Sequence, residues 1–297
     1  MKTALCRYAT ALGLIAGLGL SHNAYAVWTF DQSNVTNVAA TAPKVTGDPT
    51  VSLSGVYATN NSSGVVGGNW NAGALSWYSG GGQGMTSGTD NGTSPNHALD
   101  NSGTTEAVLL NFSSSVSLSS IGLGYTSDGT CGSSHVALKA DGTCPSGTTL
   151  NTNTTVDLSV FRWVGTGAPT GTPPLVGQAA NTMSGWQLVG NYGGAIQDTT
   201  NPYNLVNTTG LGSSWWLISA YNSGFAQSAG TTENKSTLDN GNDFFKLYSV
   251  AGTTCTGSGS NCGGTTGNKG VPEPGSLALA SLALMGVFFT RRKTTQS

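Results

Sequence analysis

Charge is the first thing this chain lacks. Only 8% of its 297 residues are Asp, Glu, Lys or Arg, and it has three histidines. Between residues 27 and 270 we find six basic and twelve acidic side chains, a net charge of about −6. Nucleic-acid binding requires a dense Lys/Arg surface, so this class of partner is excluded.

Helix-forming residues are also scarce. Gly alone contributes 44 residues, and Gly, Thr, Ser and Asn together make up about half of the chain. All four are unfavourable in helix interiors, which argues against long helices. Seven Trp, nine Tyr and eight Phe remain to build a core. This composition favours an exported, mostly β protein.

The N-terminus has the pattern of a secretory signal peptide over residues 1–26. Lys2 and Arg7 are followed by an apolar stretch, residues 9–20, which is too short to span a membrane. Ala24 and Ala26 form the small-x-small cleavage pattern. We therefore expect a signal helix that is removed, and a mature chain that starts at Val27.

The C-terminus combines three features in a fixed order. They are a short motif (Val271, Pro272, Glu273, Pro274), an apolar run (277–289) and a basic stop (Arg291, Arg292, Lys293). As a helix the run would be about 20 Å long, short of the roughly 30 Å hydrocarbon core. The arrangement resembles the PEP-CTERM sorting signal of exosortase-dependent bacterial proteins. The resemblance implies an exosortase as partner, transient anchoring in the inner membrane through a short transmembrane helix, cleavage near the motif, and release to the cell surface or extracellular matrix.

Between the two ends, short apolar segments alternate with Gly, Asn, Ser and Asp turn clusters, as in β proteins. The candidate strands are 51–56, 107–112, 116–125, 156–164, 186–189, 215–220 and 244–250. The continuous run 107–112 predicts a strand covered on both faces, and Ser119-Ser120 interrupts an alternating pattern as a bulge would. We predict an all-β fold, a single antiparallel, jelly-roll-like sandwich with long loops over 27–252, then a stalk at 253–270 before the sorting signal at 271–297.

Four cysteines remain after removal of Cys6 with the signal peptide. An even number in an exported chain indicates disulfides, with three connectivities open. Asp-Gly-Thr-Cys occurs twice, ending at Cys131 and Cys144, which favours local pairing of these two. Cys255 and Cys262 would then close a loop in the stalk. A metal site is the weaker alternative, because no CxxC occurs and no histidine is near the stalk pair.

Two Asp/Asn-rich blocks, 94–101 and 238–247, each contain Leu-Asp-Asn. Such residues commonly start turns by bonding their own backbone, and that is one interpretation. The other is a structural Ca²⁺ site with Asp100, Asn101, Asp239 and Asp243 as ligands, because Ca²⁺ takes carboxylate and carbonyl oxygens from loops. The spacing does not match an EF-hand.

Aromatic residues suggest a second kind of site. Trp70, Trp77 and Tyr78 occur in a Gly/Ser/Asn-rich stretch without strand periodicity. Exposed aromatic rings can stack on sugars while their polar ends stay hydrogen-bonded. These three side chains either bind a carbohydrate ligand, such as exopolysaccharide, or fill the core.

Several segments within 95–250, including 97–101 and 242–247, also resemble a family of exosortase-dependent surface proteins. This resemblance implies a surface location and no catalytic residues. The chain contains no HExxH, GxSxG or P-loop motif, and a hydrolase would have to use groups such as His97 or Glu106 without positional support. We expect a non-catalytic surface or biofilm-matrix protein without a cofactor, and a structural Ca²⁺ stays the open alternative. A carbohydrate-binding module is the first alternative and a secreted polysaccharide hydrolase the second.

Overall fold

The computed structural model describes residues 25–30, 48–79, 81–88, 90, 94–139, 142–199, 204–225, 231–233, 238–255 and 262. All of them belong to one compact unit of the chain. Within these ranges the fold is all-β, and no helix is long and apolar enough to cross a membrane. The strands are β1 (Tyr25–Thr29), β2 (Val51–Thr59), β3 (Asn71–Tyr78), β4 (Gly82–Thr86), β5 (Leu99–Asp100), β6 (Thr104–Ser127), β7 (Thr130–Cys131), β8 (Val136–Ala137), β9 (Val156–Trp163), β10 (Trp186–Ala195), β11 (Asn204–Leu205), β12 (Ser213–Ala220), β13 (Thr231–Glu233) and β14 (Phe244–Thr254).

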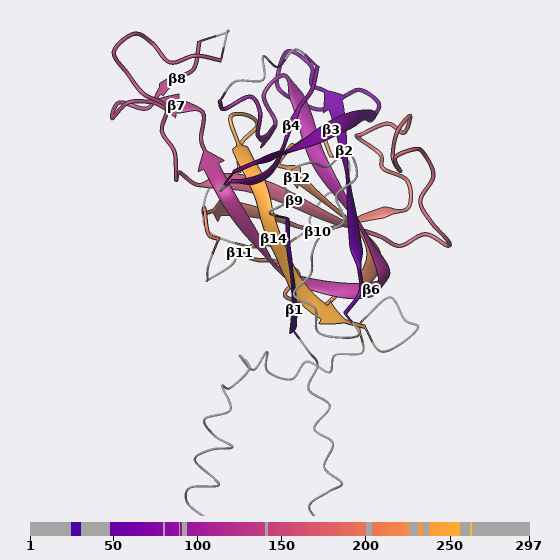
Figure 1. Cartoon of the computed structure of the whole chain (residues 1–297). Coiled ribbons are helices and arrows are strands. Elements are labelled where there is room, and N and C mark those ends of the chain that lie inside the picture. Colours follow the sequence, from indigo (N-terminus) through magenta and orange to yellow (C-terminus); the bar gives the residue numbers. More distant parts are fainter. Residues whose placement is uncertain are drawn as a thin grey trace, which may run out of the picture. The chain divides into compact units, whose positions relative to one another are not determined.

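Strand β6 organises the sheet. Its 24 residues pair with β2 and β12 over the first half and with β14 over the second half. The two halves meet at a serine triplet in which Ser113 and Ser114 are exposed. In Figure 1, β6 crosses the molecule as the long magenta ribbon, with β14 in orange beside it.

The sheet closes on itself, which the sequence did not predict. β14 pairs with β4, β4 with β3, β3 with β2, β2 with β6, and β6 again with β14, so these five strands form a barrel-like ring. Strands β12, β9, β10 and β13 extend the sheet from β6, and β13 is parallel to β10. The predicted sandwich of separate antiparallel sheets is therefore not confirmed. The long strand β6 belongs both to the ring and to its extension through β12, so the two parts form one continuous sheet.

Apolar side chains form two cores on opposite faces of β6. Val108 and Leu110 belong to the first core, and Ala107 and Leu109 belong to the second. This alternation explains the continuous apolar run and confirms that the strand is covered on both faces. The predicted bulge is also confirmed, because Ala251 pairs with Ser120 and Gly252 with Leu118, which skips Ser119.

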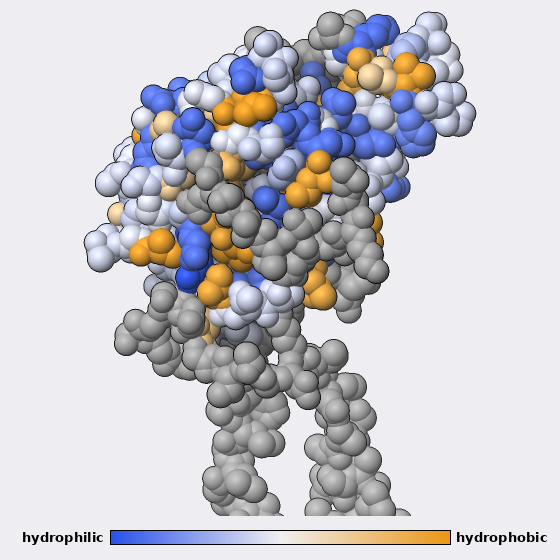
Figure 2. All heavy atoms as spheres, turned by 180° about the vertical axis from the view of Figure 1, so that it is seen from behind, coloured by the Kyte–Doolittle hydropathy of each residue, from blue (hydrophilic) through white to orange (hydrophobic). Residues whose placement is uncertain are grey.

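The outer surface is polar. Only four large apolar side chains of the described residues are exposed, Val136, Val164, Ile196 and Leu205. Figure 2 shows small apolar patches separated by polar residues on one face. Burial of the apolar residues in the two cores is therefore nearly complete.

Candidate functional site

The two Asp/Asn-rich blocks meet, which the Ca²⁺ interpretation of the sequence required. β5 pairs with the start of β14, and Asn101 and Asp243 bond each other reciprocally. The Asn101 amide nitrogen donates to Asp243 Oδ2 at 2.8 Å, and the Asp243 backbone N–H donates to Asn101 Oδ1 at 3.0 Å. Both residues are almost fully buried. The contact ties the loop before β6 to the start of β14.

A residue that the sequence did not single out, Asp157, completes this group. Its backbone N–H donates to Asp243 Oδ1 at 2.7 Å. Its carboxylate accepts from the backbone N–H groups of Gly194 at 3.1 Å and Asp239 at 3.2 Å. We call Asn101, Asp157 and Asp243 the amide-capped cluster. Burial, and then the Asp157 charge, raise the pKa of Asp243 well above its ordinary value. Each Asp243 oxygen accepts a hydrogen bond, which fits a role in fixing turns.

Asp100 belongs to a different group. Asp90, Asp100 and Glu106 each offer a carboxylate oxygen, and these three oxygens lie within 4.8 Å of one another. We call them the carboxylate trio. Among the described residues this is the one set of three His, Cys, Asp or Glu side chains gathered so closely. The sequence had placed Asp100 with Asp239 and Asp243. It overlooked Asp90, and Glu106 was considered only for hydrolysis.

The trio has unusual electrostatics because it is buried. Asp100 and Glu106 have no exposed surface, and Asp90 is partly buried. Burial is the main cause that raises the pKa of Asp100 and Glu106 well above their ordinary values. The negative charge of Asp90 raises the pKa of Asp100 further, and the charge of Asp100 raises that of Glu106. Burial also raises the pKa of Asp90. Three carboxylates in one site cannot all ionise cheaply without a counter-charge.

The aromatic residues divide between core and surface. Trp70 is 1% exposed and stacks on Phe225 in the second core, with ring centroids 6.3 Å apart. Its proposed role as a sugar platform is therefore wrong, because its faces are covered by protein. Trp77 and Tyr78 are half-buried on β3, a strand that the sequence pattern did not reveal.

Tyr78 contributes to an aromatic enclosure around a buried lysine. The Lys246 Nζ atom lies 4.3 Å from the ring centroid of Tyr78 and 4.6 Å from that of Tyr125. The His97 ring stacks on Tyr78, and the two ring centroids are 4.3 Å apart. Lys246 is 5% exposed, and burial lowers its pKa from 10.5 to about 8. Lys246 forms no ion pair with any of the described residues. The electron-rich faces of the two tyrosine rings interact with its ammonium group instead of a carboxylate.

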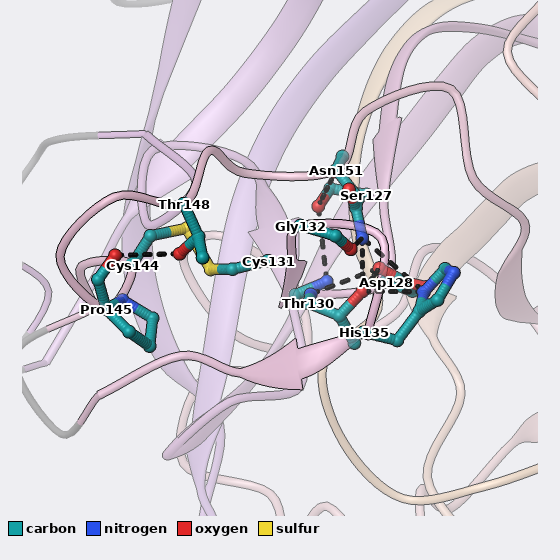
Figure 3. The surroundings of a disulfide bond; sticks show 11 residues. Ser127, Asp128, Thr130, Cys131, Gly132, His135, Cys144, Pro145, Thr148 and Asn151 are labelled. Atoms are coloured by element: carbon teal, nitrogen blue, oxygen red, sulfur yellow. Dashed lines mark hydrogen bonds and ion pairs between the residues drawn. A yellow bond between two sulfur atoms is a disulfide. The ribbon is translucent and has the colours of Figure 1, made fainter.

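Both predicted disulfides are confirmed, Cys131–Cys144 and Cys255–Cys262. The first links the base of a surface excursion to its returning end (Figure 3), with the two Cα atoms 5.8 Å apart. Beside it, Asp128 Oδ1 accepts from the Thr130 hydroxyl at 2.7 Å, and Asp128 Oδ2 lies 3.5 Å from His135 Nδ1. The disulfide and these side-chain hydrogen bonds, and not a hydrophobic core, hold this segment in its conformation.

The terminal signals lie largely outside the described residues. Ala24 of the cleavage pattern, the motif at 271–274, the apolar run and the basic stop at 291–293 all fall there. Ala26 is described and is 2% exposed in β1, which pairs with β14. The last strand ends at Thr254, two residues beyond the predicted domain end.

Comparison with known proteins identifies one feature. Residues 270–293 match the PEP-CTERM protein-sorting motif, which confirms the resemblance seen in the sequence. The motif indicates exosortase-dependent export and sorting to the bacterial cell surface. No curated protein and no solved structure matches the chain significantly.

Proposed function

We propose that this protein is a non-catalytic component of the bacterial cell envelope or biofilm matrix, released there after exosortase processing. The observation that carries the proposal is the sorting motif at 270–293, preceded by a folded, disulfide-linked β unit. A low charge and a hydrogen-bonding Thr/Ser/Asn surface suit a polysaccharide environment, where no single charged partner is required.

Processing is tested by mass spectrometry of the surface form of the protein. We expect a C-terminus near Pro272–Gly275 and no peptide from the apolar run at 277–289. A strain without the exosortase is the control, and its protein should keep the peptides that contain Arg291 to Lys293. Intact C-terminal peptides on the surface of the parent strain would contradict the proposal.

The matrix role is tested by deleting the gene. We expect changes in cell aggregation, surface texture or retention of matrix, with unchanged growth on polymeric nutrients. A mutant that lost the ability to degrade one polymer would favour the hydrolase instead. Glu106→Gln and His97→Ala would then identify the groups involved.

Carbohydrate binding is the second candidate, supported by the half-buried Trp77 on β3; its neighbour Tyr78 already packs against Lys246 and His97. Glycan-array binding with and without Ca²⁺ tests this candidate. Trp77→Ala should abolish binding if the ring is a sugar platform. Trp215→Ala is a matched control, because Trp215 is a half-buried tryptophan that packs against the second core. Equal loss in both variants would count against a sugar site at Trp77.

A further inference from the structure

The carboxylate trio draws its members from three different elements. Asp90 lies in the loop after β4, Asp100 ends the short strand β5, and Glu106 lies near the start of β6. None of these positions is adjacent in the sequence, so the gathering of their oxygens within 4.8 Å is a result of the tertiary fold. Bringing three carboxylates together costs electrostatic free energy, which an interaction with a positive group would offset.

Each carboxylate is held by a backbone N–H on one oxygen. Ser87 N donates to Asp90 Oδ2 at 2.9 Å, Ser102 N to Asp100 Oδ1 at 2.8 Å, and Asp100 N to Glu106 Oε2 at 3.2 Å. These bonds fix one oxygen of each group through a backbone donor. The three carboxylates are therefore oriented by the backbone in the absence of a ligand.

The opposite oxygens of the two buried members have no partner. Asp100 Oδ2 and Glu106 Oε1 are buried and accept no hydrogen bond, although both side chains are completely excluded from solvent. A buried polar atom without a partner is costly and rare in native proteins. Two such atoms within one group of carboxylates indicate a missing positive partner. No Lys, Arg or His forms an ion pair with the trio among the described residues.

The spacing fits a single ion. Ca²⁺ binds oxygens at about 2.3–2.6 Å, so two ligands on opposite sides of the ion are about 4.8 Å apart. All three trio oxygens satisfy this upper limit. Ser87, whose backbone N–H holds Asp90, also carries a hydroxyl oxygen, which lies 3.0 Å from Thr104 Oγ1. The donor set is entirely oxygen, which suits Ca²⁺ or Mg²⁺ and not zinc or copper.

We propose that Asp90, Asp100 and Glu106 form a Ca²⁺ site that fastens the loop after β4 to β5 and β6. Ca²⁺ is favoured over Mg²⁺ because it accepts carboxylates in irregular geometry and gives up its water more readily. The half-buried Asp90 provides the route of entry. This site differs from the ligand set expected from the sequence, and it shares only Asp100 with that set. It does not depend on the proposed matrix function.

The experiment uses the full chain, purified in mild detergent and stripped with EDTA. Thermal unfolding is followed by tryptophan fluorescence, and CaCl₂ or MgCl₂ is added up to about 10 mM. We expect a saturable rise of several degrees in Tm with Ca²⁺, a clearly smaller rise with Mg²⁺, and one Ca²⁺ per chain by calorimetry. An absent shift, or a larger one with Mg²⁺, would overturn the proposal.

Three variants locate the ion. Glu106→Gln keeps the shape of the side chain, and Asp90→Asn keeps an oxygen that can accept from the Ser87 backbone N–H. Each variant should weaken Ca²⁺ binding at least tenfold. Asp239→Asn is the matched control, because Asp239 is an exposed carboxylate from the sequence-predicted set. It should bind Ca²⁺ as the parent does. Loss of binding in Asp239→Asn, or unchanged binding in the two trio variants, would refute the site.

Discussion

Asp100 and Asn101 are neighbours in the chain, yet they belong to two buried polar clusters of opposite character. Asn101 joins the amide-capped cluster, where both oxygens of Asp243 accept hydrogen bonds. Asp100 joins the carboxylate trio, where one oxygen of Asp100 and one of Glu106 have no partner. Burial is similar in both clusters. The number of hydrogen-bond donors therefore decides whether a buried carboxylate fixes the fold or awaits a ligand.

The largest effect is expected from Asp243→Ala. This change removes the acceptor of the Asp157 backbone N–H and one of the two acceptors of the Asn101 side-chain amide, which keeps its bond to the Tyr221 carbonyl oxygen. Each buried donor left without a partner costs about 1–3 kcal/mol. We expect the free energy of unfolding to fall by about 3 kcal/mol, measured by urea denaturation. Asp239→Ala, at an exposed position, should change it by no more than about 0.5 kcal/mol. A loss from Asp243→Ala as small as that of Asp239→Ala would remove the structural role of the amide-capped cluster.

The second effect concerns pH in the absence of divalent cations. The pKa values of Asp100, Glu106 and Asp243 are raised in the folded protein, so the folded state holds more protons than the unfolded state above about pH 4. Their contribution to stability is complete below the ordinary pKa and is lost as the pH rises through the raised pKa. We expect Tm in EDTA to fall between pH 5 and pH 7.5. A Tm that rises over this interval would contradict the raised pKa values.

Glu106→Gln should have the opposite sign to Asp243→Ala. The new side chain removes one buried charge, keeps an oxygen to accept from Asp100 N, and offers an amide to its neighbours. In EDTA at pH 7.5 we expect a gain of about 1 kcal/mol in the free energy of unfolding. Chemical denaturation in EDTA measures it. Destabilisation by Glu106→Gln in cation-free buffer would show that the trio is balanced without a ligand.

Lys246→Met tests a third way in which this protein accommodates a buried charged group, namely contact with aromatic ring faces. Because burial lowers the Lys246 pKa to about 8, the charged form is disfavoured in the folded protein at pH 7. Methionine keeps the packing between Tyr78 and Tyr125, so we expect a stability gain below about 1 kcal/mol at pH 7, which shrinks as the pH rises from 8 to 10. Lys139→Met, at an exposed position, should give no pH-dependent difference. A clear loss with Lys246→Met would mean that the two rings stabilise the charge more than burial disfavours it.

The sequence was most informative where a pattern is local. Alternating apolar residues predicted a strand at 156–164, observed at Val156–Trp163, and an interruption at Ser119-Ser120, because strand periodicity is a property of the backbone. Repeated Asp-Gly-Thr-Cys predicted the pairing of Cys131 with Cys144 for the same reason, since both cysteines lie within one short excursion. The hairpin of β3 and β4 was missed, because its glycines and exposed residues show no apolar alternation.

The sequence by itself determined the class of structure, the sorting motif and the two disulfides, all of which depend on composition or on residues close in the chain. Only the tertiary structure decided that β6 bends to close a ring, that Trp70 is core, and that Asp100 faces Asp90 and Glu106 while Asn101 faces Asp243. The physical reason is that successive side chains of an extended chain point in different directions, and Asn101 directly follows the end of β5 at Asp100. What each then meets depends on strands that come from elsewhere in the chain.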